Sequence, residues 1–175
     1  RENDSNDNKI WFNSDGTLLI DTDATGEVRW TWGPSANTWY HLAICSTSNS
    51  AKCYVNGSEL DLYSGYNATV TGGFPAINGN LLIGVQNDGS FARYFNGYID
   101  SFRAVAGVAV YTGEFTVPTS RLSAIQSNQG TNIADITGTA TKLLIHSNQQ
   151  ITDSSSNNTS ILTQPNHNFP IPRQT

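Results

Sequence analysis

Apolar residues recur in short runs over the first 119 residues, with Gly, Asn, Asp and Ser between the runs. In 27–32, apolar and polar residues alternate and place Val28, Trp30 and Trp32 on one face of a strand. The tetrapeptide Asn-Ser-Asp-Gly at 13–16 is typical of a hairpin turn with Gly at the strained position. This spacing predicts strands at 9–12, 17–20, 27–32, 39–45, 52–55, 58–62, 81–85 and 95–103.

Helix signals are weak, and only 104–110 has the pattern of a single short helical turn. Within the predicted strand 95–103, Tyr98, Asp100 and Phe102 share one face. Short strands separated by turns predict an all-β fold, an antiparallel jelly-roll β-sandwich with almost no helix.

Composition narrows the class of protein further. The 175 residues suit one domain, or one domain with an appendage, and only 13% of them are charged. The net charge of −5, with no cluster of Lys and Arg, argues against a nucleic-acid partner. No segment has the apolar length of a membrane span, so we expect no membrane insertion. The polar start at 1–8 lacks Met, which leads us to expect a piece of a longer chain.

The two cysteines fall in one predicted hairpin. Cys45 and Cys53 are equally spaced from Asn49, so we expect them to lie opposite each other on two antiparallel strands. A directly opposed pair comes close enough for a disulfide, which would point to an oxidising location. The same positions also suit two small buried thiols, and the sequence leaves both alternatives open.

The loop at 21–27 offers the one candidate metal site. Asp21, Asp23 and Glu27 are spaced carboxylates beside a Gly, and such oxygen ligands suit calcium. The alternative is a hairpin turn in which the Asp side chains accept hydrogen bonds from their own backbone amides. Calcium is the only cofactor that we consider.

Four segments carry a resemblance to a known family. They are Thr38-Trp-Tyr-His-Leu-Ala-Ile-Cys45, Lys52-Cys-Tyr-Val-Asn-Gly57, Tyr94-Phe-Asn-Gly-Tyr-Ile-Asp-Ser-Phe-Arg103 and Gly107-Val-Ala-Val-Tyr-Thr-Gly-Glu-Phe-Thr-Val-Pro-Thr119. Together they resemble laminin-G-like, concanavalin A-like lectin/glucanase domains, most of all those repeated in bacteriophage and large-virus structural proteins. The resemblance covers about residues 10–119 well and 141–161 loosely. It implies a jelly-roll β-sandwich that displays, binds sugars or builds assemblies.

The resemblance also suggests how the chain is divided. Residues 1–119 look like a laminin-G-like sandwich without its opening strands, 120–140 like a linker, and 141–175 like a strand with an extended tail. That last part resembles the start of a next repeat or a strand donated to a sandwich. We expect 143–146 to form an added strand beside the sandwich of its own chain or of a neighbour, because an unpaired sheet edge is an association site.

Sugar binding needs exposed aromatic rings beside directional polar groups. For each ring the alternative is a place in the sandwich core. The candidates are Trp30, Trp32, Tyr63, Tyr66, Asn87, Asp88, Phe91 and Tyr94.

Catalytic residues are not predicted. Catalytic members of this fold carry Glu-x-Asp-x-x-Glu on one strand, and the chain has no such motif. Glu59 and Asp61 match only its first half, and the family's acidic position after Asp100 holds Ser101. His41, His146 and His167 are too scattered to indicate a catalytic arrangement.

From the residues and the resemblance together, we predict a non-catalytic structural or display module of a virus particle, in a tail, a fibre or the capsid surface. Its partners would be other virion proteins or copies of itself, and host surface glycans. The location would be the virion surface or extracellular space. The alternatives are a sugar-binding adhesin module on a cell surface and, from another class, a glucanase-like hydrolase.

Overall fold

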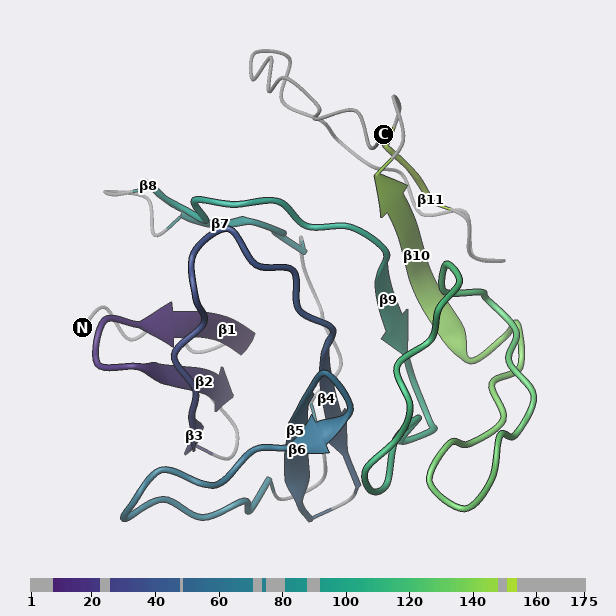
Figure 1. Cartoon of the computed structure of the whole chain (residues 1–175), viewed down its shortest axis with the longest axis horizontal. Helices are drawn as coiled ribbons and strands as arrows, with labels where there is room; N and C mark the ends of the chain where they lie inside the picture. Colours follow the sequence, from purple (N-terminus) through teal and green to yellow (C-terminus); the bar gives the residue numbers. More distant parts are fainter. Residues whose placement is uncertain are drawn as a thin grey trace.

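The computed structural model describes residues 8–22, 26–47, 49–70, 74, 81–87, 92–147 and 151–153. In these ranges the chain forms strands but no helix, and every strand pair is antiparallel. This architecture is the predicted all-β class (Figure 1). The strands are β1 (Asn8–Asn13), β2 (Thr17–Thr22), β3 (Gly26–Thr31), β4 (Leu42–Ser46), β5 (Ala51–Val55), β6 (Ser58–Glu59), β7 (Val85–Asn87), β8 (Ala92–Tyr94), β9 (Phe102–Val105), β10 (Thr141–Ser147) and β11 (Ile151–Asp153).

The first sheet has the order β1-β2-β3. Gly16 ends the predicted turn between β1 and β2 with a φ of 77°, a conformation that favours glycine. Leu18 stands opposite Trp30 and Ile20 opposite Val28, so these four side chains share one face. All four are at most 3% exposed, which confirms the predicted facing of β3.

The second sheet has the order β4-β5-β6. Asn56 and Gly57 turn the chain from β5 into β6 with φ values of 51° and 87°, the pattern of a type I′ turn. The predicted strand 58–62 extends only over Ser58–Glu59. After β6 the chain crosses to the first sheet, where the amide of Tyr63 donates to the carbonyl of Arg29 at 2.8 Å.

The expected direct opposition of the two cysteines is wrong by one residue. Cys45 pairs with Lys52, and Cys53 pairs with Ile44. The reason is the four-residue loop between β4 and β5, which Thr47 closes through its amide to the carbonyl of Ser50 at 2.9 Å. A shift of one residue moves a side chain to the other face of a sheet. The two thiols therefore face opposite sides of the hairpin, and both are free.

The β4–β5 hairpin separates two hydrophobic cores. The first core lies between it and the first sheet and consists of Leu18, Ile20, Val28, Trp30, Ala51, Cys53 and Val70. The second core lies on its other face and consists of Tyr54, Val110, Tyr111, Ile133 and Ile136. Because β5 alternates, Cys53 belongs to the first core and Tyr54 to the second.

The third sheet contains the strand expected near residue 143. β10 pairs with β9 of the same chain, with Leu144 opposite Arg103 and Ile145 opposite Phe102. Leu143 and Leu144 point to opposite faces and are 8% and 3% exposed. This strand is thus supplied in cis and is covered on both faces.

The stretch 120–140, which the sequence suggests is a linker, contributes to the second core. Ile133 and Ile136 are buried there, and Ile136 exchanges backbone hydrogen bonds of 2.7 and 3.0 Å with Gln126. Two apolar side chains among polar neighbours are enough to anchor this segment. Its backbone is satisfied by loop-to-loop bonds rather than by a long ladder.

Two predicted strands are largely wrong. Strand β7 begins only at Val85, because Gly84 adopts a φ of 77° just before it, and Leu81 and Leu82 are exposed. The predicted strand 95–103 is a loop up to Ser101, whose φ of 54° breaks the extended conformation. Strand β9 starts at the next residue.

Candidate functional site

The outer face of the first sheet carries a connected polar network. We call this surface the Arg29 face. In the register, Arg29 is opposite Leu19, and Leu19 is opposite Trp11, so these three side chains share the face turned away from the first core. Tyr63 joins it from the segment that pairs with β3. The full set is Trp11, Asn13, Asp15, Glu27, Arg29, Tyr63 and Tyr66.

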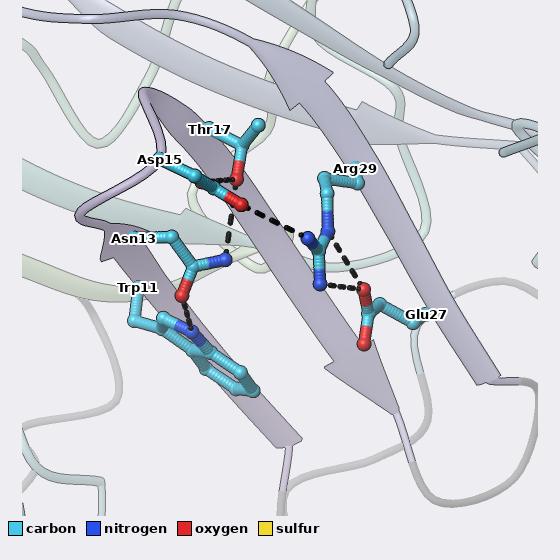
Figure 2. Close-up of polar contacts among 6 residues, drawn as sticks. All are labelled: Trp11, Asn13, Asp15, Thr17, Glu27 and Arg29. Carbon is cyan, nitrogen blue, oxygen red and sulfur yellow. Dashed lines mark hydrogen bonds and ion pairs between the residues drawn. The ribbon is translucent and has the colours of Figure 1, made fainter. Parts of the chain in front are cut away.

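Arg29 is the centre of this network (Figure 2). Its Nε donates to Glu27 Oε1 at 2.8 Å, and its Nη2 lies 2.5 Å from the same oxygen. Its Nη1 donates to Asp15 Oδ2 at 3.3 Å. Burial opposes the charge of Arg29, but the hydrogen bond and negative charge of Glu27 outweigh it and raise the pKa of the guanidinium. The guanidinium is therefore held as a fixed cation.

A chain of hydrogen bonds extends from the network across β1. Trp11 Nε1 donates to Asn13 Oδ1 at 2.8 Å, and Asn13 Nδ2 donates to Thr17 Oγ1 at 3.2 Å. Thr17 Oγ1 in turn donates to Asp15 Oδ1 at 2.5 Å. Each side chain is oriented by the next, so the indole and the guanidinium belong to one ordered surface.

Two tyrosines complete the Arg29 face. The guanidinium carbon of Arg29 lies 4.8 Å from the ring centroid of Tyr66 and 5.9 Å from that of Tyr63, within the range of a cation–π contact. The two rings are 6.0 Å apart, and Tyr63 is 37% exposed. The face thus combines aromatic surface with fixed donors and acceptors.

The predicted sugar-binding residues are divided by the structure. Trp30 is 1% exposed inside the first core and is unable to stack on a ligand. Trp32 packs against the same core, edge-on to Phe12 and Tyr40. The interpretation of Trp30 as ligand-binding is wrong, because alternation on β3 directs it into the core. For Trp32, which is only partly buried, ligand binding stays a prediction. Tyr63 and Tyr66 do lie together.

The remaining predicted residues lie on β7 and β8 or outside the described part of the chain. Tyr94 is 64% exposed on β8. Asn87 ends β7, and its side chain lies outside the described residues, as do Asp88 and Phe91.

The predicted calcium ligands are described in part. Asp21 and Glu27 are opposite each other on β2 and β3, whereas Asp23 lies outside the described residues. Glu27 is bound to Arg29, which would compete with any metal ion for that carboxylate. No group of three or more His, Cys, Asp or Glu side chains in the described part of the chain is arranged to hold a metal ion. The calcium site stays a prediction.

A surface depression of about 220 Å³ lies elsewhere, beside the third sheet. Three distant segments form it, at 40–42, 100–101 and 118–122. Its lining residues are Tyr40, His41, Leu42, Asp100, Ser101, Pro118, Ser120 and Leu122. We call it the Ser101 depression.

Sequence reasoning missed the central residues of both places. Arg29 carried a detectable signal, because it alternates with the core residues Val28 and Trp30 on β3 and so had to face outward. Trp11 carried no such signal, because its neighbours Ile10 and Phe12 are themselves exposed. The Ser101 depression had no such signal, because its three segments meet only through the tertiary fold.

The comparisons with known proteins identify the family. Residues 1–110 match a laminin-G-like family described as the Concanavalin A-like lectin/glucanases superfamily. The match spans more than half of the chain, and the antiparallel all-β fold is consistent with a sandwich of this kind. The chain therefore belongs to the concanavalin A-like lectin/glucanase superfamily. No curated protein and no solved structure matches it. None of the described residues forms a helix that is long and apolar enough to cross a membrane.

Proposed function

We propose that this chain is a non-catalytic display module of a virus particle that binds host glycans. The observation that carries the glycan-binding part is the Arg29 face. The particle part rests on the resemblance of 94–103 and 107–119 to repeats of viral structural proteins. The partners would be other virion proteins or further copies of the chain, and the location the particle surface.

The Arg29 face has the two kinds of group that a sugar requires. Tyr63, Tyr66 and Trp11 offer apolar ring surface for the C–H face of a pyranose. Asn13, Asp15 and Glu27 offer acceptors, and Arg29 offers guanidinium N–H groups in a fixed position. Because hydrogen bonds within the face already orient these groups, a ligand would lose little affinity to ordering side chains.

The non-catalytic part rests on how the carboxylates are used. Glycosidases need one carboxyl that donates a proton and a second that attacks or activates water. On the Arg29 face, Asp15 and Glu27 both bind Arg29. Glu59 forms an ion pair of 2.8 Å with Lys52. These carboxylates are used in ion pairs that hold side chains and strands in place. Such a use is typical of a structural role rather than of catalysis.

A glycan array tests the binding. The 175-residue chain should bind a subset of the glycans, and Tyr66→Ala should weaken that binding at least tenfold. Tyr94→Ala, which removes an aromatic ring outside the Arg29 face, should leave binding unchanged. No binding to any glycan, or equal losses for both variants, would contradict a glycan site on this face.

Two further measurements address the rest of the proposal. Incubation with laminarin should release no reducing sugar, whereas turnover abolished by a single carboxylate substitution would reverse the non-enzyme assignment.

Antibodies against the chain should label purified virus particles from its source. Labelling of a cell surface instead would favour an adhesin.

A further inference from the structure

We propose that the Ser101 depression binds a single uncharged sugar unit, as a second subsite separate from the Arg29 face. The inference rests on the proposed glycan-binding function and names the place and chemical class of an additional contact. It starts from the shape of the depression. Its volume of about 220 Å³ is below the range typical for drug-sized ligands, which suits one ring rather than an extended chain.

The lining has both polar and apolar groups. Asp100, Ser101 and Ser120 provide a carboxylate and two hydroxyls, and Tyr40 adds a phenol. Leu42, Pro118 and Leu122 provide apolar walls. A sugar ring has hydroxyls around its edge and C–H groups on its faces, so it can use both kinds of lining.

Exposed aromatic rings lie on the same segments as the lining. Trp39 precedes Tyr40 and is 63% exposed, and Tyr98 is two residues before Asp100 and is 55% exposed. Their ring centroids are 6.4 Å apart, so the two segments meet through these rings. Together the two rings offer a stacking platform beside the depression.

Ser101 is held in a strained conformation at this place. Its φ of 54° lies in the left-handed region that favours glycine. Its amide donates to Asp100 Oδ1 at 2.8 Å, and its Oγ lies 3.4 Å from Nδ1 of His146 on β10. Strained residues that neighbouring groups hold in place concentrate at ligand sites. Here the strain fixes the hydroxyl at the edge of the depression.

Charge indicates that the ligand is neutral. Arg103 acts on His41 of the lining through its positive charge, but its guanidinium N–H groups are used elsewhere and donate to the Ser123 carbonyl at 2.9 Å and to Gln126 Oε1 at 3.2 Å. The one charged side chain of the lining at neutral pH is Asp100, which would repel a carboxylate or a sulfate. An acidic sugar is therefore a poor ligand for this depression.

Chemical-shift perturbation in two-dimensional NMR tests the assignment. The whole chain would be titrated separately with D-glucose, D-galactose, D-mannose, N-acetylglucosamine and N-acetylneuraminic acid. We expect at least one neutral sugar to shift the resonances of the Trp39 indole and of the Ser101 and Ser120 amides, and the acidic sugar to leave them unchanged.

Variants at the depression test the same assignment. Asp100→Asn keeps an acceptor for the Ser101 amide and should weaken binding at least tenfold, as should Trp39→Ala. Ser120→Ala, a milder change, serves if either variant melts early, and Tyr66→Ala should leave these shifts intact.

The outcomes separate the two proposals. Suppose that the array detects glycan binding, but neutral sugars shift only the resonances of Tyr63 and Tyr66, or none. The proposal of a second subsite is then wrong, and the proposed function stands. If the acidic sugar shifts Ser101 and Ser120, the neutral class is wrong. If resonances of the depression shift but the array is negative for every glycan, the proposal of a glycan site on the Arg29 face is wrong. The subsite then stands as a monosaccharide site. Absence of both signals overturns both proposals.

Discussion

The two cores on either side of the β4–β5 hairpin differ in chemistry. The first core is built from aliphatic side chains around Trp30, and all of its members are 3% exposed or less. The second core is aromatic: Tyr111 and Phe115 stack at 3.6 Å between ring centroids, and Tyr54 and His41 meet Phe115 edge-on. One hairpin thus supports an aliphatic core around Trp30 on one face and an aromatic core that contains tyrosine hydroxyls on the other.

The difference extends to hydrogen bonding. Two buried polar atoms of the described residues, the Tyr54 hydroxyl and His41 Nδ1, have no hydrogen-bond partner, whereas the Tyr111 hydroxyl faces the guanidinium of Arg103. All three side chains belong to the second core or pack against it. An unpaired buried polar group costs free energy that an apolar core does not have to offset. We infer that the first core supplies most of the stability and the second core holds the Ser101 depression, through His41, at some cost.

The largest expected effect is in the first core. Trp30→Ala should lower the free energy of unfolding by about 3–5 kcal/mol, because it removes a fully buried indole and leaves a cavity. Urea denaturation followed by circular dichroism measures this loss. Ile125→Ala is the matched control: Ile125 is 67% exposed, so the change should fall within about 0.5 kcal/mol of the wild type. Similar losses for the two variants would mean that Trp30 does not anchor the first core.

The next largest effect should come from the turn that attaches the second core. Gly57 accepts a hydrogen bond from the Phe115 amide at 3.0 Å, and a Cβ at Gly57 would collide with the Phe115 carbonyl. Gly57→Ala should therefore cost about 2–3 kcal/mol. Gly16→Ala has a similar φ but open space, so it should cost only about 1 kcal/mol. Equal losses of stability for the two variants would show that Phe115 moves away from the added Cβ at little cost.

The first core could be predicted from the sequence because its signals are local. Alternation in 27–32 and the glycine of the first turn fix which side chains face inward, and the structure confirms both. The added strand near Leu143 was also found, because its apolar run stands out from a polar background. The glycan candidates Tyr63 and Tyr66 came from the same local reading of aromatic residues.

The second core and the Ser101 depression could not be predicted in this way. Tyr54, Tyr111 and Ile136 come from distant parts of the chain, and no periodicity links them. The position of Cys45 depended on the number of residues in one loop, which sets the register. The break at Ser101 is a positive φ at a residue that rarely adopts one, and sequence patterns carry little information about such strain.

A smaller effect, of the opposite sign, is expected for Tyr54→Phe. Burial raises the pKa of Tyr54, which indicates a poorly solvated phenol, and its hydroxyl has no hydrogen-bond partner. Removing the hydroxyl keeps the ring and should raise the free energy of unfolding by roughly 1 kcal/mol. Tyr63→Phe, at an exposed tyrosine, should change it little. A loss of stability for Tyr54→Phe would mean that a buried water satisfies the hydroxyl and that the second core is better paired than we infer.

The pH dependence of stability should also distinguish the two cores, because among the described residues a half-buried histidine packs against the second core and none packs against the first. Burial, and then the positive charge of Arg103, lower the pKa of His41 below its ordinary value of about 6.5. The folded state therefore disfavours the charged imidazole. The contribution of neutral His41 to the free energy of unfolding is complete above the ordinary pKa. This contribution is lost as the pH falls from the ordinary pKa towards the lowered pKa of the folded state. Tyr111 and Phe115 pack on the ring, Arg103 adds positive charge, and Asp100 is the carboxylate that lines the same depression. Melting temperatures from pH 8 to pH 5 should fall more steeply for the wild type than for His41→Phe, which keeps an aromatic ring without a titrating group. Parallel curves would show that His41 is solvated enough to protonate freely, and the contrast between the two cores would then rest on the Tyr54 hydroxyl alone.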